Sequence, residues 1–360
     1  MSKSIYSTYI PRADLATIIR LSGEEIRNFL EQASPDDFRG EANAALKAYR
    51  KDKSLYSDKH LIAYGTNIEQ AIDFPMRIEV RHASGFGAAQ VVAKGVWGAG
   101  ARQEAIKRIR EALAKVDKRV EVRLAGTSSF EFNVKGVNKS GSIRFLRHAW
   151  PEVLAQMNYT PGPYIDSRKT GTIIAADGDG TIYDGPKAGH ELPTMAKSIA
   201  KDALIGWLEA GGVFMLNSGN QLSRNVFRIK DGIPAHLFNR ILVSGNGGAD
   251  LVCFDDKQNA VEVKGYNELA ISKLEIKHKL DIIYIGDDGS EDGNDWAGFV
   301  EVGFDRAVLV AKDFKRSYDA RLRTGYIGHF VRGTKTYLEI ATLKAKNAKG
   351  KPFLSAWAVS

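Results

Sequence analysis

Hydrophobic positions in the first half of the chain alternate between strand-like and helical periods. The strand-like segments lie at 75–81, 88–97, 119–126 and 129–137, and an amphipathic helix is predicted at 101–116 between the second and third of them. This β-β-α-β-β order predicts a small α+β domain. An earlier stretch, 13–50, has apolar residues at helical spacing and predicts a helical N-terminal segment.

A second pattern begins after a stretch containing proline, glycine and serine near residue 160. Short apolar strands are predicted at 172–176, 213–217, 240–245 and 281–286, with helices at 195–211 and 267–280. Strands that alternate with helices are typical of an α/β domain with a Rossmann-like parallel sheet flanked by helices.

These patterns divide the chain into four parts. We expect a helical segment at 1–55, an α+β domain at 56–157 that ends in a helix at 140–157, a linker at 158–170, and the α/β domain at 171–360. The first part carries no group of chemical interest, so packing or oligomerisation is its expected role.

Composition excludes several classes of protein. Hydrophobic residues make up 44% of the 360 residues, enough for a core, and no apolar run reaches the ~18 residues of a membrane span. The N-terminus lacks the apolar stretch of a secretory signal. Cys253 is the single cysteine, which excludes an internal disulfide and a multi-cysteine zinc site. We therefore expect a cytoplasmic protein without a membrane partner.

Charge is distributed unevenly. The net charge is +8, and basic residues predominate over 94–169 and 306–351, whereas 281–295 contains only acidic charges. Basic regions around an acidic pocket suit an anionic ligand held by a metal, and they equally suit contact with nucleic acid.

The segment IIAADGDGTIYDG (173–185) is the strongest chemical feature. An apolar strand leads directly into Asp177 and Asp179, and ligands bind at the carboxyl ends of parallel strands. Two carboxylates in one pocket need a neutralising proton or cation. A hard divalent ion such as Mg²⁺ suits these oxygen ligands.

A second apolar strand also ends in acids. DIIYIGDDGSEDGNDW (281–296) places Asp287, Asp288, Glu291 and Asp292 just after the strand. An EF-hand loop starting at Asp288 is excluded because its twelfth position is Phe299 rather than glutamate. Two acidic strand ends in one sheet predict a metal site.

The segment VFMLNSGN (213–220) places a hydroxyl and small residues after a third strand. Ser218 and Gly219 could donate hydrogen bonds to a phosphoryl oxygen, and Arg224 could contact a substrate anion. A Ser-Gly pair also ends strands for reasons of local turn geometry.

Together these segments resemble the haloacid dehalogenase superfamily of phosphohydrolases over roughly 171–311. The resemblance rests on Asp-x-Asp-Gly-Thr after one strand, Ser218 after the next and Gly-Asp-Asp after a later one. SGNGGADLV (244–252) and YIGDDGSED (284–292) are similar to segments of its sugar-phosphatase branch, which includes trehalose- and sucrose-phosphate phosphatases.

The resemblance implies a role for each matching residue. Asp177 would be the nucleophile that forms an aspartyl-phosphate, and Asp179 the general acid and base. The Asp177 carboxylate, the Asp179 backbone carbonyl and Asp287 would bind Mg²⁺, assisted by Asp288 or Asp292. Ser218 and Gly219 would bind the phosphoryl group.

The phosphate-binding lysine of this family has two candidates. Lys264 precedes Asp287 in a Lys-Gly segment similar to the family's own, whereas Lys139 lies in a segment, 130–146, that resembles the junction between cap and core. Lys139 comes before the first aspartate motif, which is not the family's order. Either a cap-like domain stands N-terminally here, as in a permuted chain, or 56–157 is an unrelated domain.

The expected function is therefore Mg²⁺-dependent hydrolysis of a small phosphorylated metabolite, such as a sugar phosphate, by a chain with a haloacid dehalogenase core. Two alternatives stay open. The basic surface would suit a phosphatase acting on nucleic-acid ends, and the fold could also serve a binding protein without catalysis.

Overall fold

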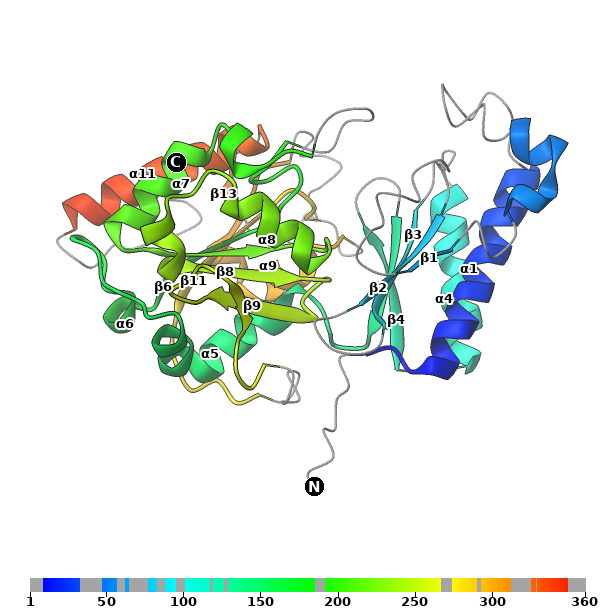
Figure 1. The fold of residues 1–360 in the computed structure, drawn as a ribbon, viewed down its shortest axis with the longest axis horizontal. Helices are drawn as coiled ribbons and strands as arrows, with labels where there is room; N and C mark the ends of the chain where they lie inside the picture. The colour runs from blue at the N-terminus through cyan, green and yellow to red at the C-terminus, as the bar shows by residue number, and fades with distance from the viewer. Residues whose placement is uncertain are drawn as a thin grey trace. The chain divides into compact units, whose positions relative to one another are not determined.

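The computed structural model divides the chain after Gly136 into two compact units (Figure 1). The residues it describes are 9–32, 47–56, 62–64, 77–82, 88–94, 101–116, 119–125, 129–184, 192–266, 274–289, 293–311, 325–327 and 329–348. Among these residues no helix has both the length and the apolar character needed to cross a membrane.

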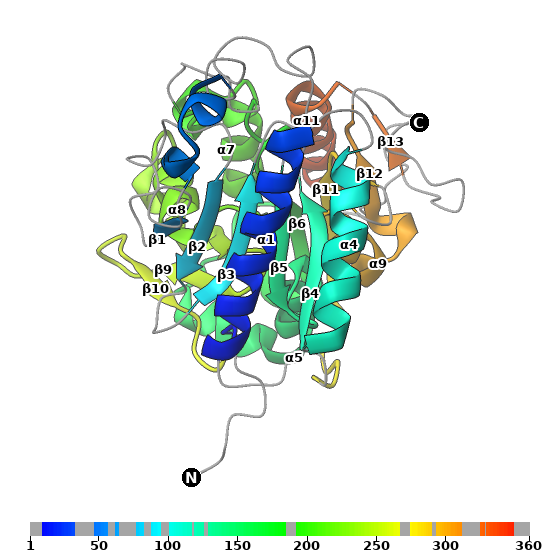
Figure 2. The same ribbon diagram turned by 90° about the vertical axis from the view of Figure 1, so that its right-hand side faces the viewer.

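The smaller unit is an α+β domain with a five-stranded sheet in the order β1-β2-β3-β5-β4. Its strands are β1 (Ile62–Tyr64), β2 (Arg77–His82), β3 (Ala88–Lys94), β4 (Val120–Ala125) and β5 (Ser129–Val134). Helices α1 (Arg12–Gln32) and α4 (Ala101–Val116) lie side by side along this sheet (Figure 2). A short 3-10 helix, η2, spans Lys53–Tyr56. The predicted β-β-α-β-β order is confirmed.

Two predicted domain boundaries are wrong. The N-terminal segment 1–55 is not a separate part, because α1 packs on α4, β2 and β3 and buries Ile18, Ile26 and Leu30. The boundary predicted after residue 157 lies instead after Gly136. The helix that follows, α5 (Lys139–Gln156), buries its apolar face in the larger unit.

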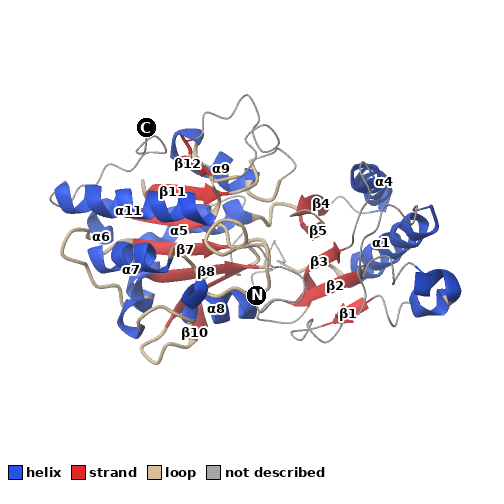
Figure 3. Ribbon diagram, turned by 90° about the horizontal axis from the view of Figure 1, so that it is seen from above, coloured by secondary structure: helices blue, strands red, loops and turns tan. Residues whose placement is uncertain are grey.

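The larger unit is α/β, with an eight-stranded, largely parallel sheet flanked by helices (Figure 3). The strand order is β10-β9-β8-β7-β6-β11-β12-β13, and the pairs from β8 to β13 are parallel, whereas β9 and β10 pair antiparallel. The strands are β6 (Thr172–Ala176), β7 (Val213–Asn217), β8 (Ile241–Gly245), β9 (Asp250–Phe254), β10 (Ala260–Glu262), β11 (Asp281–Gly286), β12 (Ala307–Leu309) and β13 (Gly325–Tyr326).

Alternating side chains of the central strand enter two hydrophobic cores. Ile174 and Ala176 of β6 pack on one face, under α7 (Lys201–Ala210), α8 (Leu222–Lys230) and α11 (Val331–Asn347). Ile173 and Ala175 pack on the other face, under α5 and α9 (Trp296–Val302). A strand buried on both faces explains why its sequence is continuously apolar.

Shorter helices complete the unit. They are α6 (Ser167–Thr170), η4 (Met195–Lys197), η5 (Ala235–Arg240) and η7 (Phe304–Arg306). The helix predicted at 195–211 is interrupted, because η4 ends at Lys197 and α7 begins at Lys201. The predicted linker 158–170 is also wrong, because this segment lies inside the larger unit and contains α6.

The helix predicted at 267–280 is not present in its described part, 274–280, and 267–273 lies outside the described residues. The face of the sheet that this helix would cover is already occupied by α5. The amides of Lys277 and His278 donate to the Arg147 carbonyl of α5 instead, so the segment crosses that helix in an irregular conformation.

Candidate active site

Three strands end in polar residues at one edge of the larger sheet. Asp177 follows β6, Ser218 follows β7 and Asp287 follows β11, and β6 lies between the other two. The next strand along the chain, β7, pairs with one side of β6, whereas the later strand β11 pairs with the other side of β6. Such a reversal in strand order opens a crevice at the carboxyl ends, where ligands of α/β proteins bind.

The loop after β6 is fixed by its own backbone. The Asp177 amide donates to the Ile285 carbonyl at 2.9 Å, and the amides of Ile182 and Tyr183 both donate to the Gly178 carbonyl at 3.0 Å. Gly180 has a φ of +80°, and a Cβ there would overlap the Asp287 carboxylate. Glycine is therefore required both for the backbone conformation and for the close approach of Asp287.

Lys139 reaches this edge from the first turn of α5. Its Nζ lies 2.6 Å from Asp177 Oδ1 and 2.7 Å from Asp295 Oδ1, and its side chain is only 2% exposed. The Asn138 side chain caps the helix by accepting from the Ser140 amide, and Asn217 Nδ2 donates to the Lys139 carbonyl at 2.8 Å. The start of α5 is thus tied to the end of β7.

Asp295 is a central acid of the site that the sequence analysis did not name. Its Oδ1 accepts from Lys139 and from the Tyr284 hydroxyl at 2.9 Å, and its Oδ2 accepts from the amides of Asp287 and Asp288 at 3.0 and 3.1 Å. Asp295 therefore orients both Lys139 and the turn after β11. The sequence did indicate this residue, because Asp295 is the last acid of the run 281–295 and stands at the start of the next helix, α9.

Carboxylate oxygens of Asp177, Asp287 and Asp295 lie within 4.8 Å of one another. Burial raises the pKa of Asp177 to about 7, with Lys139 opposing the rise and Asp295 adding to it. Burial, together with the charges of Asp295 and Asp177, also raises the pKa of Asp287 well above its usual value. Burial opposes the charge on Lys139, but its two carboxylate partners hold its pKa well above the usual value.

This acid cluster fits a divalent cation. When all groups are ionised, three carboxylates (−3) and Lys139 (+1) leave a net charge of −2 in a buried place. Hard cations such as Mg²⁺ prefer carboxylate oxygens. Since both Asp295 oxygens already accept hydrogen bonds, Asp177 and Asp287 are the residues best placed to hold the ion.

Asp179 faces a different set of partners. Its Oδ1 accepts from Arg228 Nη2 at 2.7 Å and its Oδ2 from Asn220 Nδ2 at 2.6 Å. Burial would raise the pKa of Asp179, but Arg228 and then Asn220, with a further contribution from Arg224, lower it below the usual value. Its carboxylate is outside the acid cluster, and the expected contribution of its backbone carbonyl to the metal stays a prediction.

Ser218 lies directly beside the loop that follows β6. A Cβ on Gly178 would sit 3.1 Å from Ser218 Oγ, and this hydroxyl accepts from the Asn220 amide at 3.2 Å. Because the hydroxyl accepts there, its own proton can be donated to a phosphoryl oxygen. Gly219 is buried in the same turn, and the Arg224 charge acts on Asp179.

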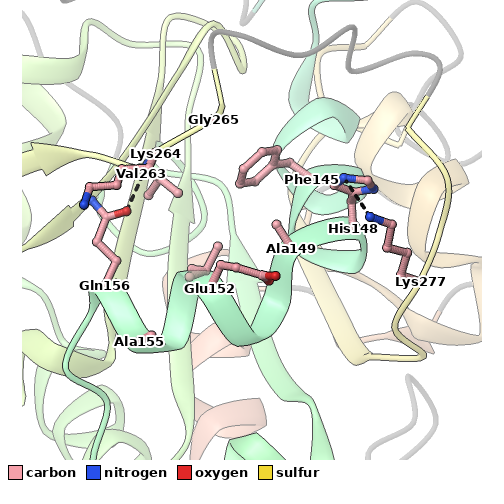
Figure 4. A pocket seen from close by; sticks show the side chains of 11 residues that line it. Phe145, His148, Ala149, Glu152, Ala155, Gln156, Val263, Lys264, Gly265 and Lys277 are labelled. Carbon is pink, nitrogen blue, oxygen red and sulfur yellow. Dashed lines mark hydrogen bonds between the residues drawn. The ribbon is translucent and has the colours of Figure 1, made fainter.

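Lys264 is not brought to this site. Its amide donates to Gln156 Oε1 at 2.9 Å, at the far end of α5, and the 18 residues of that helix span roughly 25 Å. Its exposed side chain lines a separate hollow of about 680 Å³ on the outside of α5, opposite His148 and Lys277 (Figure 4). The structure therefore corrects the prediction of Lys264 as a phosphate ligand.

The structure places one of the two other predicted metal ligands, Asp288, outside the cluster. Asp288 follows Asp287, but its side chain packs against Gly293, where a Cβ would overlap it. Asp292 lies outside the described residues. Asp287 is the predicted acid after β11 that the structure groups with Asp177.

Comparison with models of protein families, with curated proteins and with solved structures gives no match for this chain.

Proposed function

We propose that the larger unit is a Mg²⁺-dependent phosphomonoesterase with a haloacid dehalogenase core. The observation that carries this proposal is the contact of Lys139 with Asp177 at the carboxyl edge of β6. A carboxylate nucleophile, a group of acids suited to a cation, and a buried ammonium and hydroxyl suited to phosphate occur together there. This combination is what phosphoryl transfer needs, since its catalysis is mainly positioning and charge stabilisation.

In the first step, an Asp177 oxygen attacks phosphorus, and the bond from phosphorus to the leaving oxygen breaks. Asp179 takes up a proton when the phosphate dianion binds beside it, because a nearby negative charge raises the pKa of a carboxyl group, and it gives this proton to the leaving oxygen. Lys139 and Ser218 hold the phosphoryl oxygens. Asp177 and Asp287 would hold Mg²⁺, which would offset the charge of the attacking carboxylate and of the phosphate.

In the second step, water attacks the phosphorus of the aspartyl-phosphate. The bond to Asp177 breaks, the water proton passes to Asp179, and the Asp177 carboxylate is restored as phosphate leaves. The ionised Asp179 is suited to accept that proton.

The position of Lys139 before Asp177 in the chain supports the account in which the family's lysine is supplied by an upstream helix, as in a permuted chain. That the smaller unit serves as a cap stays a prediction. A sugar phosphate is the expected substrate, on the similarity of 244–252 and 284–292 to sugar phosphatases.

Phosphate release tests this function. The wild type and Asp177→Asn are assayed on sugar phosphates, nucleotides and 5′- or 3′-phosphorylated oligonucleotides, with Mg²⁺ and with EDTA. We expect Mg²⁺-dependent release from sugar phosphates that Asp177→Asn reduces by more than ~10³-fold. Release that persists in the variant would contradict the assignment of Asp177, and release from oligonucleotides alone would indicate a nucleic-acid end phosphatase. No release from any substrate would favour a binding protein.

A further inference from the structure

Arg228 makes several contacts beside the site but has no role in the reaction steps proposed above. It lies in the second turn of α8, and its side chain is 0% exposed. Its guanidinium carbon lies 4.0 Å from the centroid of the Tyr183 ring, and its Nε donates to the Pro193 carbonyl at 2.7 Å. A planar guanidinium stacked on a ring and bonded at its edge has little rotational freedom.

Arg228 also shapes the site through Asp179. Its Nη2 donates to Asp179 Oδ1, while Asn220 donates to Oδ2. We call these two donors the Asp179 clamp. Tyr183 and Asp179 form a β-bridge, and the Gly180 amide donates to the Tyr183 carbonyl, so Arg228 holds both ends of the loop that carries Asp179.

The clamp leaves part of the carboxylate accessible. The Asp179 side chain is 28% exposed, whereas that of Arg228 is fully buried. A fully buried guanidinium cannot meet a substrate, so any effect of Arg228 on the reaction must pass through Asp179. Proton transfer depends on the direction of the accepting oxygen, and misplacement of about 1 Å can cost ~10²-fold in rate.

We propose that Arg228 is a positioning residue that fixes the Asp179 carboxylate toward the water that hydrolyses the phosphoenzyme. This inference rests on the proposed function. In the step concerned, water adds to phosphorus, the bond from phosphorus to Asp177 breaks, and Asp179 receives the water proton. Arg228 takes no proton and touches no reacting atom.

p-Nitrophenyl phosphate with Mg²⁺ isolates this step, because its leaving group departs without a proton and the first step then makes little demand on Asp179. In a two-step reaction, kcat/KM reports formation of the phosphoenzyme, and kcat reports its hydrolysis when that step is slow. We expect Arg228→Met to lower kcat by roughly 30-fold or more with kcat/KM kept within about threefold. The fraction of enzyme trapped as phosphoenzyme should rise, and Arg228→Lys should give intermediate values.

Arg240→Met is the matched control. Arg240 is partly buried and donates to the carbonyls of Leu208 and Thr160, but it touches no residue of the site. A purely structural loss would make the two methionine variants alike, without accumulation of phosphoenzyme, and would overturn the inference. If Arg228→Met does not fold, Asn220→Ala, which removes the other half of the clamp, must lower kcat and accumulate phosphoenzyme.

Different results would overturn the role of Arg228 and the proposed phosphatase function. A wild type that turns over while neither clamp variant accumulates phosphoenzyme overturns the role of Arg228 alone. A wild type that forms no phosphoenzyme overturns the proposed function and the role of Arg228 with it.

Discussion

Lys139 and Asp177 are 38 residues apart in the chain, yet the lysine Nζ and the aspartate Oδ1 lie 2.6 Å apart and are both buried. The contact exists because α5 begins at the edge of the sheet where β6 ends. The chain then runs along this helix to the opposite edge, where β6 begins. The contact joins a cation at the start of a helix to an acid at the end of a strand.

Lys139→Met removes the cation that lies against Asp177 and Asp295 in the acid cluster. Breaking a buried ion pair leaves uncompensated charge, so we expect the metal-free protein to lose about 3–5 kcal/mol in its free energy of unfolding, measured by urea denaturation in EDTA. Phosphate release should fall by about 10²–10³-fold, as when a single donor to the transition state is lost.

Lys264→Met is the control for that variant. The exposed Lys264 is attached at the opposite end of α5 from Lys139, so both stability and phosphate release should be unchanged. A loss of activity in Lys264→Met with retention in Lys139→Met would reverse the assignment of the lysine.

The acid cluster predicts how stability depends on pH without metal. Burial raises the pKa of Asp177 from 3.8 to about 7, so between these values the folded state binds more protons than the unfolded state. The free energy of unfolding of the protein should therefore fall as pH rises from about 4 to about 7 in EDTA. Asp177→Asn should flatten this slope.

Added Mg²⁺ should raise the melting temperature more above pH 7 than at about pH 5, because protonated carboxylates bind cations poorly. Thermal unfolding at several pH values measures both effects. Stabilisation by Mg²⁺ that is the same at each pH would contradict a site made of these acids.

Gly180→Ala tests the close approach of the loop after β6 to Asp287. Gly265 is the matched control, because it has the same φ of +80° but no described residue has an atom within 4 Å of an added Cβ. Both variants should lose about 1–2 kcal/mol from backbone strain. Only Gly180→Ala should weaken Mg²⁺ binding and lower activity, by up to ~10²-fold. If both variants lost Mg²⁺ binding and activity to the same extent, backbone strain alone would explain the loss.

Cys253 tests the burial of β9. Burial raises the pKa of its thiol to about 11, and the side chain lies in the core beneath α5. A thiol that is both buried and protonated should not react with a thiol reagent near pH 8 until the strand opens. We expect labelling only with denaturant, and immediate stoichiometric labelling of the native protein would contradict this core.

The sequence predicted those elements whose hydrophobic period was strong. The central strands and the positions of Asp177, Ser218 and Asp287 after them could be found because buried parallel strands are continuously apolar and end in polar residues. The acid run after β11 was found as a group, but Asp295 was missed because its role comes from hydrogen bonds to Lys139 and Tyr284.

Long-range packing decided the rest. The choice between Lys139 and Lys264 could not be made from spacing, because it depends on which helix covers the sheet face beside β6. The helix predicted at 267–280 is absent from its described part, 274–280, for the same reason, since α5 occupies that face. The pairing of Asp179 with Arg228 joins residues 49 positions apart, which no local pattern indicates.

The central claim is that Asp177 becomes phosphorylated during turnover. Wild-type protein mixed with substrate and Mg²⁺ is quenched and treated with borohydride, which reduces an aspartyl-phosphate to homoserine, and the peptides are analysed by mass spectrometry. The account predicts homoserine at position 177, dependent on substrate and absent from Asp177→Asn. Turnover without reduction at Asp177, or reduction at another acid, would contradict it.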